Sequence, residues 1–123
     1  IKEISYIHAE AFAAGELKHG TIALIEKGTP VIAIATQEEL FEKMVSNMEE
    51  VRARGAYVIA IAQEKNTEVE KAADKVIYIP NVDDIVSSIL TVLPLQLLSY
   101  YVAVERGCDV DKPRNLAKSV TVE

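Results

Sequence analysis

The sequence predicts an α/β domain in which a parallel β-sheet lies between layers of helices, a three-layer αβα sandwich. Short, continuously apolar runs recur along the chain, and segments whose apolar residues have helical spacing separate them. Such continuous runs are typical of strands that are covered on both faces. Because right-handed crossovers through helices join parallel strands, we expect a doubly wound sheet.

Ahead of the sheet, residues 4–18 place apolar residues at helical spacing and are rich in alanine and glycine. We predict one helix there, which ends near Gly20. Residues 21–25 form a short apolar run that fits a strand or a helix equally. Residues 26–30 contain Gly and Pro and are predicted to form a turn.

Three strands are predicted, at residues 31–35, 57–62 and 76–79. Thr36 and Glu39 have the spacing of a capping box, so we predict that the helix between the first two strands starts there and ends before Gly55. A shorter helix is predicted to start at Thr67, after the second strand.

A long helix is predicted from Asn81 or Asp83 to Arg106. It is apolar on nearly all sides, which is typical of a helix buried in a large core or in an oligomer interface. It also contains polar residues and a proline, at Ser87, Ser88, Thr91, Pro94, Gln96 and Ser99. We therefore expect no transmembrane span, and we expect the proline to kink or restart the helix.

Composition narrows the class of protein. With 123 residues, of which 50% are hydrophobic, the chain can form one globular domain with an aliphatic core. A net charge of −6 argues against sequence-independent binding of nucleic acid. The single cysteine, Cys108, is typical of a cytoplasmic protein, and the histidines and cysteine lack zinc-site spacing. The chain starts at Ile1 without a methionine, so we expect a fragment of a longer protein.

Doubly wound sheets bind ligands at the carboxyl ends of their strands. Here those ends are residues 35–37 and 62–64, which are neither glycine-rich nor lined with Ser and Thr as a phosphate cradle would be. Nucleotide binding is therefore not expected. Taken singly, polar residues such as Glu3, His19 and Lys118 are more often solvated surface groups than catalytic ones.

Three segments nevertheless resemble one enzyme family. They are KEISYIHAEAFAAGELKHG at residues 2–20, EEVRARG at 49–55 and VLPLQLLSYYVAVERGCDVDKPRNLAKSVTVE at 92–123. The chain resembles the glutamine–fructose-6-phosphate aminotransferases (isomerizing), or glucosamine-6-phosphate synthases. The likeness is to the second of that enzyme's two sugar-isomerase (SIS) subdomains, which are flavodoxin-like. One departure is Thr21, because the family usually has a proline after Lys-His-Gly.

The resemblance implies how the chain is organised and which partners and ligands it binds. Residues 1–107 correspond to the second SIS subdomain, and residues 108–123 to a C-terminal active-site tail. The implied partners are the first SIS subdomain and the glutaminase domain of the same longer chain, a second copy in a homodimer, and the sugar phosphates fructose 6-phosphate and glucosamine 6-phosphate. The family is cytoplasmic and uses no metal and no other cofactor, and neither nucleic acid nor membrane is implied.

The resemblance also implies catalytic roles. Glu3 would be the base that moves a proton between C1 and C2 of the sugar, and His19 the acid–base group for ring opening, contributed across the dimer interface. Lys118 would supply the amine that forms a Schiff base with the open ketose. Arg114, four residues earlier, is expected to lower the pKa of Lys118. Arg114 and Ala117 are expected to contact the substrate.

Two other functions stay open at this point. One is a related SIS enzyme, a fructosamine-phosphate deglycase, which shares the fold and a base glutamate. The other is a non-catalytic, sugar-phosphate-binding SIS module. The Lys-His-Gly triplet and the tail at residues 111–123 favour the synthase, and a non-catalytic module is expected to keep a phosphate cradle and lose the three catalytic residues, the reverse of what this chain has.

Overall fold

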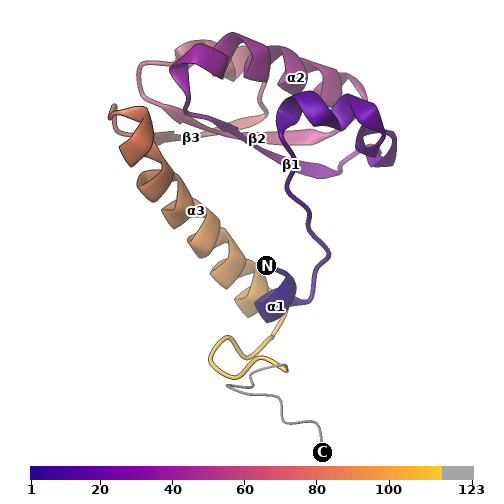
Figure 1. Ribbon diagram of the computed structural model, residues 1–123. Coiled ribbons are helices and arrows are strands. Elements are labelled where there is room, and N and C mark those ends of the chain that lie inside the picture. Colours follow the sequence, from indigo (N-terminus) through magenta and orange to yellow (C-terminus); the bar gives the residue numbers. More distant parts are fainter. Residues whose placement is uncertain (115–123) are drawn as a thin grey trace, which may run out of the picture. The chain divides into compact units, whose positions relative to one another are not determined.

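The computed structural model describes residues 1–114 of the chain (Figure 1). The chain forms two compact units. The larger unit comprises residues 12–92, and the smaller comprises residues 1–11 with residues 93–123, of which 93–114 are described. Each unit has its own local structure, and the sheet belongs to the larger one.

The sheet of the larger unit has three parallel strands in the order β1-β2-β3. They are β1 (Pro30–Ala35), β2 (Tyr57–Gln63) and β3 (Lys75–Ile79). The predicted strands are confirmed, and each observed strand begins or ends within one residue of the prediction. The α/β class with a parallel sheet flanked by helices is therefore confirmed. The reversal of strand order that makes a sheet doubly wound does not occur among these described strands.

Helix α2 (Phe41–Ala53) covers one face of the sheet, as Figure 1 shows. This face carries small side chains. The buried alanines Ala33, Ala60 and Ala62 lie on this face. Small strand residues leave room for larger helix side chains, and Met48 and Val51 of α2 are buried against them. This layer is the hydrophobic core of the unit.

The opposite face of the sheet carries isoleucines. Ile34, Ile61 and Ile77 lie in register across the three strands. Ile61 on the central strand is 1% exposed, whereas Ile34 and Ile77 are 43% and 41% exposed. The prediction of burial on both faces therefore holds for β2 and is wrong for β1 in the described chain, and β3 is likewise half-exposed on this face.

The start of α2 differs from the predicted capping box. A single 3₁₀ turn, η3 (Glu38–Leu40), precedes the helix, and α2 begins at Phe41 without a side-chain cap. Thr36 is buried, 3% exposed, so its hydroxyl faces the interior instead of the helix end. The end of the helix agrees with prediction, because Gly55 follows it with φ 97°, a left-handed conformation that favours glycine.

The predicted helix over residues 4–18 is wrong. The structure has a short helix, α1 (Lys2–Ser5), and a separate 3₁₀ helix, η1 (Ala14–His19), with non-helical backbone between them. Tyr6 ends α1 in a left-handed conformation with φ 57°, which interrupts the helical path that the alanine content favours. The ambiguous apolar run at residues 21–25 forms a second 3₁₀ helix, η2 (Thr21–Leu24).

Helix α3 (Asp84–Glu105) begins in the larger unit and ends in the smaller one. Of the two predicted caps, the structure uses Asp83, whose carboxylate accepts a hydrogen bond from the Ile85 N–H at 3.0 Å. The helix continues through Pro94, so the predicted restart does not occur. A further 3₁₀ helix, η4 (Thr67–Lys71), occupies the position of the predicted short helix.

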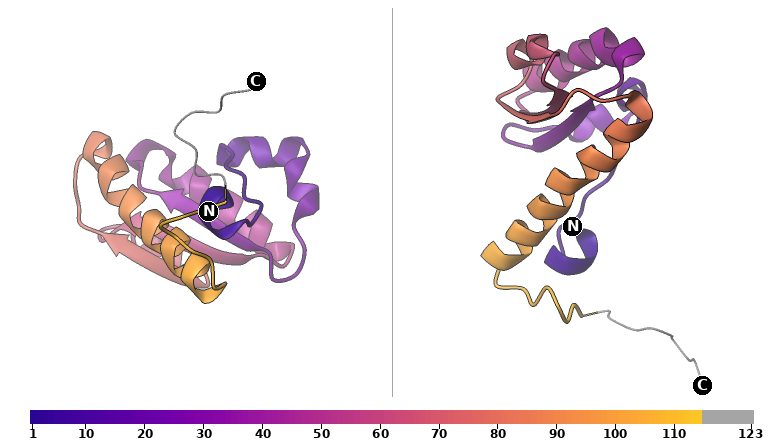
Figure 2. Two further views of the ribbon diagram at one scale, coloured as in Figure 1. Left: turned by 90° about the horizontal axis from the view of Figure 1, so that it is seen from below. Right: turned by 90° about the vertical axis from the view of Figure 1, so that its left-hand side faces the viewer.

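In the smaller unit, α1 lies beside the last turns of α3 (Figure 2). Ser5 of α1 and Ala103 of α3 are both fully buried, at 0% exposure. The small size of these two side chains permits close packing of the backbones. Beyond α3, Gly107 adopts φ 67° and the Cys108 N–H donates to the Ala103 carbonyl at 2.9 Å, which closes the helix end.

Much of the apolar surface of α3 is exposed. Ile85 is 86% exposed, Ile89 67%, Leu97 56% and Tyr101 60%. By length and composition alone the helix is long and apolar enough to cross a membrane. Its most apolar window of 18 residues has a mean hydropathy of 1.7, and 11% of that window is buried. The same length and composition also occur in helices that pack against protein.

Candidate functional site

The carboxyl ends of the strands form a network of satisfied polar groups. Gln63, at the end of β2, is 1% exposed. Its amide nitrogen donates to the Thr36 carbonyl at 2.9 Å, and its amide oxygen accepts from the Val82 N–H at 3.1 Å. The Ser87 hydroxyl lies 3.4 Å from that of Thr36. These groups bind one another, which makes this edge a junction between β1, β2 and the start of α3.

Next to this junction lies an exposed ion pair. The Lys65 ammonium donates to Glu38 Oε2 at 2.6 Å, and this hydrogen bond with its charge holds the pKa of the Glu38 carboxyl below its ordinary value. Nearby, Asn66 Nδ2 is buried and makes no hydrogen bond within the described chain. The arrangement contains no group of donors converging on an open space, as a phosphate would need.

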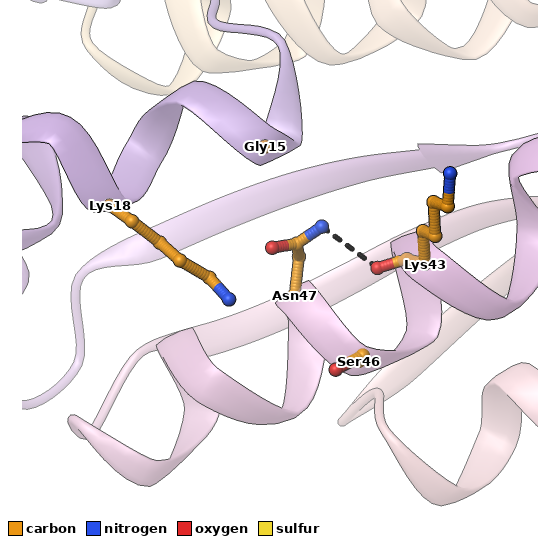
Figure 3. Close-up of a pocket in the computed structure, with 5 residues that line it drawn as sticks. All are labelled: Gly15, Lys18, Lys43, Ser46 and Asn47. Carbon is orange, nitrogen blue, oxygen red and sulfur yellow. Dashed lines mark hydrogen bonds between the residues drawn. The ribbon is translucent and has the colours of Figure 1, made fainter.

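A second feature is a hollow of about 280 Å³ between η1 and α2, lined by Gly15, Lys18, Lys43, Ser46 and Asn47 (Figure 3). The Lys18 ammonium is paired with the Glu50 carboxylate at 2.6 Å. The Asn47 amide donates to the Lys43 carbonyl of its own helix at 2.8 Å. Lys18 and Asn47 are therefore engaged locally, and the hollow borders the segment leading to His19.

His19 is the last residue of η1, and its side chain is 72% exposed. Its Nδ1 atom lies 2.8 Å from Glu16 Oε2, one turn earlier. A carboxylate only accepts hydrogen bonds, so in the neutral ring Nδ1 carries the proton and Nε2 is left as the proton acceptor. Gly20 follows with φ 150° and frees the chain to turn directly after the imidazole. This geometry orients the imidazole through Nδ1 and suits a group that exchanges a proton at Nε2.

Glu3 and Arg114 both belong to the smaller unit. Glu3 is exposed on α1. The backbone N–H of Arg114 donates to the Tyr6 hydroxyl at 2.9 Å, and its guanidinium carbon lies 4.0 Å from the centre of the Tyr6 ring. The structure therefore joins the start of the tail to the residue that ends α1. Sequence reasoning missed Tyr6, since no local pattern pairs residues that lie 108 positions apart.

The predicted site residues lie in different parts of the chain. Lys118 and Ala117 lie outside the described residues. His19 belongs to the larger unit, whereas Glu3 and Arg114 belong to the smaller one. In residues 1–114, no cluster of three or more His, Cys, Asp or Glu side chains has the geometry to hold a metal ion.

Comparison with known proteins gives these residues a context. Over its full length the chain is 67% identical to the glutamine–fructose-6-phosphate aminotransferase (isomerizing) of Caldanaerobacter subterraneus subsp. tengcongensis and 59% identical to that of Methanosarcina acetivorans. It spans about one-fifth, 20%, of the length of each of these curated relatives.

A solved structure and a family model agree with this likeness. The structure is that of the C-terminal domain of glucosamine-fructose-6-phosphate aminotransferase from Francisella tularensis. It superposes with a TM-score of 0.84 at 44% identity, covering 91% of this chain and 32% of that one. The resemblance found in the sequence is confirmed. Because the SIS domain model matches residues 1–106, the chain belongs to the SIS domain family.

Proposed function

We propose that the chain supplies part of the isomerase site of an enzyme that converts fructose 6-phosphate and glutamine-derived ammonia into glucosamine 6-phosphate. One observation carries this proposal: relatives named for this aminotransferase activity match the chain over all of its residues at up to 67% identity. The matched length includes every candidate catalytic residue, Glu3, His19 and Lys118.

The reaction begins with opening of the sugar ring, for which His19 is the acid–base group. Imidazole is the side chain that exchanges protons near neutral pH, and the Glu16 carboxylate leaves Nε2 available for this exchange. Because the His19 side chain is exposed and ends a short 3₁₀ helix, it is accessible to a sugar held by another chain. The family likeness implies that this sugar lies in the site of the partner subunit of a homodimer.

Lys118 and Glu3 carry the later steps. The Lys118 amine adds to the C2 carbonyl of the open ketose and water leaves, which forms a Schiff base. Ammonia replaces the lysine nitrogen at C2 and frees the lysine. Glu3 then takes a proton from C1 and returns it to C2, while the hydroxyl proton of C1 moves to the nitrogen. The sum is fructose 6-phosphate plus ammonia giving glucosamine 6-phosphate plus water.

The remaining parts of the assignment follow the same family likeness. Residues 1–107 act as the second SIS subdomain and residues 108–123 as its active-site tail, in which Arg114 and Ala117 contact the substrate. The phosphate cradle and the glutaminase domain lie elsewhere in the longer protein. The proposed enzyme is a cytoplasmic homodimer without a metal or other cofactor, and α3 packs against protein instead of entering a membrane.

Trapping of the Schiff base tests the assignment. The full-length protein is incubated with fructose 6-phosphate and sodium borohydride, whose hydride reduces the imine to a stable secondary amine. Peptide mass spectrometry should then find the sugar phosphate on Lys118, and the Lys118→Ala variant should carry none. A wild-type protein that is modified at other lysines only would contradict the role of Lys118.

Product analysis separates the enzyme classes. With fructose 6-phosphate and glutamine, the proposed enzyme forms glucosamine 6-phosphate and glutamate. Hydrolysis of a fructosamine phosphate without any glucosamine 6-phosphate formation would favour the deglycase. Binding of the sugar phosphate without either conversion would favour the non-catalytic module.

A further inference from the structure

Glu16 is the side-chain partner of His19, and the family likeness gives it no task. Its Oε2 atom lies 2.8 Å from His19 Nδ1. The Glu16 side chain is 66% exposed and the His19 side chain 72%. Exposed pairs of this kind contribute little to the stability of a fold, because water screens their charges. The contact therefore needs an explanation other than stability.

The 3₁₀ geometry of η1 brings these two side chains into line. A 3₁₀ helix has three residues per turn, so side chains at positions i and i+3 eclipse one another, whereas the 3.6 residues per turn of an α-helix offset them. Glu16 and His19 are three positions apart within η1. Where the sequence predicts an α-helix, the structure has a 3₁₀ helix that aligns a carboxylate with an imidazole.

The residues between them hold η1 to the rest of the larger unit. Leu17 packs against the hydrophobic core. Lys18 extends from η1 toward α2 (Figure 3), where its ammonium lies 2.6 Å from the Glu50 carboxylate. With the backbone of η1 held in this way, the freedom left to His19 is rotation of its own side chain. The hydrogen bond to Glu16 restricts that rotation.

We propose that Glu16 is a positioning residue, which holds His19 in the tautomer and orientation that ring opening requires. The reaction itself is taken from the proposed function, on which this inference rests. A neutral imidazole can carry its proton on either nitrogen, and a carboxylate at Nδ1 selects the form with the proton there. The aspartate of a Ser-His-Asp triad orients its histidine by the same chemistry. Glu16 acts through His19 and need not touch the sugar.

The selected tautomer gives ring opening a defined proton path. His19 Nε2 takes the proton of the hydroxyl on C2 of the closed sugar. The bond between C2 and the ring oxygen breaks as the C2 carbonyl forms, and the imidazolium gives the same proton to the ring oxygen. During this exchange the Glu16 carboxylate stabilises the imidazolium at Nδ1. The sugar gains and loses no atom.

NMR of the imidazole nitrogens tests the positioning without reference to catalysis. The full-length protein carries nitrogen-labelled histidine and is measured above about pH 8, where an ordinary imidazole is neutral. The His19 signals, assigned by their loss in His19→Asn, should show the proton on Nδ1, and Glu16→Ala should move it toward Nε2. Glu10→Ala is the matched control, because it removes a carboxylate 3.6 Å from the other histidine, His8. A His19 spectrum that Glu16→Ala leaves unchanged would overturn the proposal.

A substrate without a ring separates ring opening from the later steps. The analogue 5-deoxyfructose 6-phosphate lacks the hydroxyl that closes the ring. With saturating fructose 6-phosphate, Glu16→Ala should lower kcat about tenfold with a smaller change in KM, because a misoriented imidazole slows the chemical step. With the open analogue it should match the wild-type rate. Glu16→Gln, whose amide oxygen still accepts a hydrogen bond, should recover part of the loss. The melting temperature should not change, since the pair is exposed.

The outcomes distinguish this proposal from the proposed function. A wild-type protein that forms no amino sugar phosphate from either substrate contradicts the proposed function, and the nitrogen spectra still decide whether Glu16 orients His19. Equal losses with both substrates, or a loss with neither, overturn the role of Glu16 in ring opening and leave the proposed function intact. A loss confined to fructose 6-phosphate, together with the shift of the His19 proton, supports both.

Discussion

Gln63 shows how one polar side chain can organise a strand edge. Both ends of its amide are engaged by backbone groups of different segments, Thr36 and Val82. In the sequence this position marks the carboxyl end of a strand, where parallel sheets bind ligands, although the residues there lack the pattern of a phosphate cradle. In the structure the Gln63 amide forms hydrogen bonds with the protein's own backbone, because buried backbone groups need hydrogen-bond partners.

Replacing Gln63 by Leu should destabilise the sheet. The substitution leaves a buried carbonyl at Thr36 and a part-buried N–H at Val82 without their partner, at a cost of about 1–3 kcal/mol. Hydrogen exchange of the β2 amides in the full-length protein would measure the lower opening free energy. Gln37→Leu, at the exposed neighbouring glutamine, is the control, and equal effects of both variants would contradict the role of Gln63.

Glu38 provides a test of pH dependence. Its pKa lies below the ordinary value of 4.5 because Lys65 donates a hydrogen bond to its carboxylate. A lowered pKa in the folded state means that the pair contributes stability above the unfolded pKa and loses it as the pH falls through the folded one. In an NMR titration, Lys65→Met should raise the pKa of Glu38 toward 4.5, whereas Lys75→Met should not. An unchanged pKa in Lys65→Met would rule out this cause.

At the scale of elements, the turn that ends α2 depends on Gly55. Its φ is 97°, and an added Cβ would lie 3.0 Å from the Lys27 Cα atom, which is backbone and cannot easily shift. Its carbonyl also accepts from the Gly28 N–H at 2.7 Å. The link therefore joins the end of α2 to the turn before β1.

Gly55→Ala should destabilise this link by about 1 kcal/mol or more, because the native conformation is incompatible with a side chain. Gly15→Ala is the matched control, since an added Cβ there meets nothing within 4 Å. Thermal melting of the full-length protein compares the two. A melting temperature for Gly55→Ala at or above that of Gly15→Ala would be inconsistent with the strain argument.

At the scale of the whole molecule, the exposed apolar side of α3 and the half-exposed isoleucines of the sheet exceed what a small monomer leaves in water. The isolated chain is therefore expected to self-associate. Sedimentation equilibrium should detect the association, and Leu97→Glu should weaken it by placing a charge in the apolar contact. Lys75→Glu is the charge-changing control outside α3. A clean monomer at high concentration would refute the expectation.

The proposed sharing of the active site between two subunits makes a prediction about mixed dimers. Single variants His19→Ala, Lys118→Ala and Glu3→Gln should each lower synthase activity about 10²–10⁴-fold, because each removes one positioned group. Glutamine hydrolysis, which the proposed function assigns to a separate domain, should survive. Co-expression of His19→Ala with Lys118→Ala should restore part of the synthase activity, since one site of each mixed dimer then contains both wild-type residues. Verified heterodimers without any recovery would exclude the shared site.

The sequence by itself determined the strands and the helix that crosses between the first two, and it narrowed the cap of the long helix to Asn81 or Asp83, of which the structure uses Asp83. Each of these depends on local chemistry: continuous apolar runs, apolar spacing, and a side-chain oxygen that accepts a hydrogen bond from a nearby backbone N–H. The sequence also carried the candidate residues Glu3, His19 and Lys118, through motifs that resemble one family. For the same reason it misjudged residues 4–18, where alanine content favours a helix that the left-handed Tyr6 interrupts.

Only the tertiary structure decided which polar groups from distant segments contact one another. Thr36 has the spacing of a helix cap, but its burial directs it toward Ser87. Gln63 satisfies backbone groups, and Tyr6 receives Arg114 from a position 108 residues away. These pairings depend on contacts between distant segments, which the fold brings together and local propensity does not encode, because hydrogen bonds and ring stacking act only over a few ångströms.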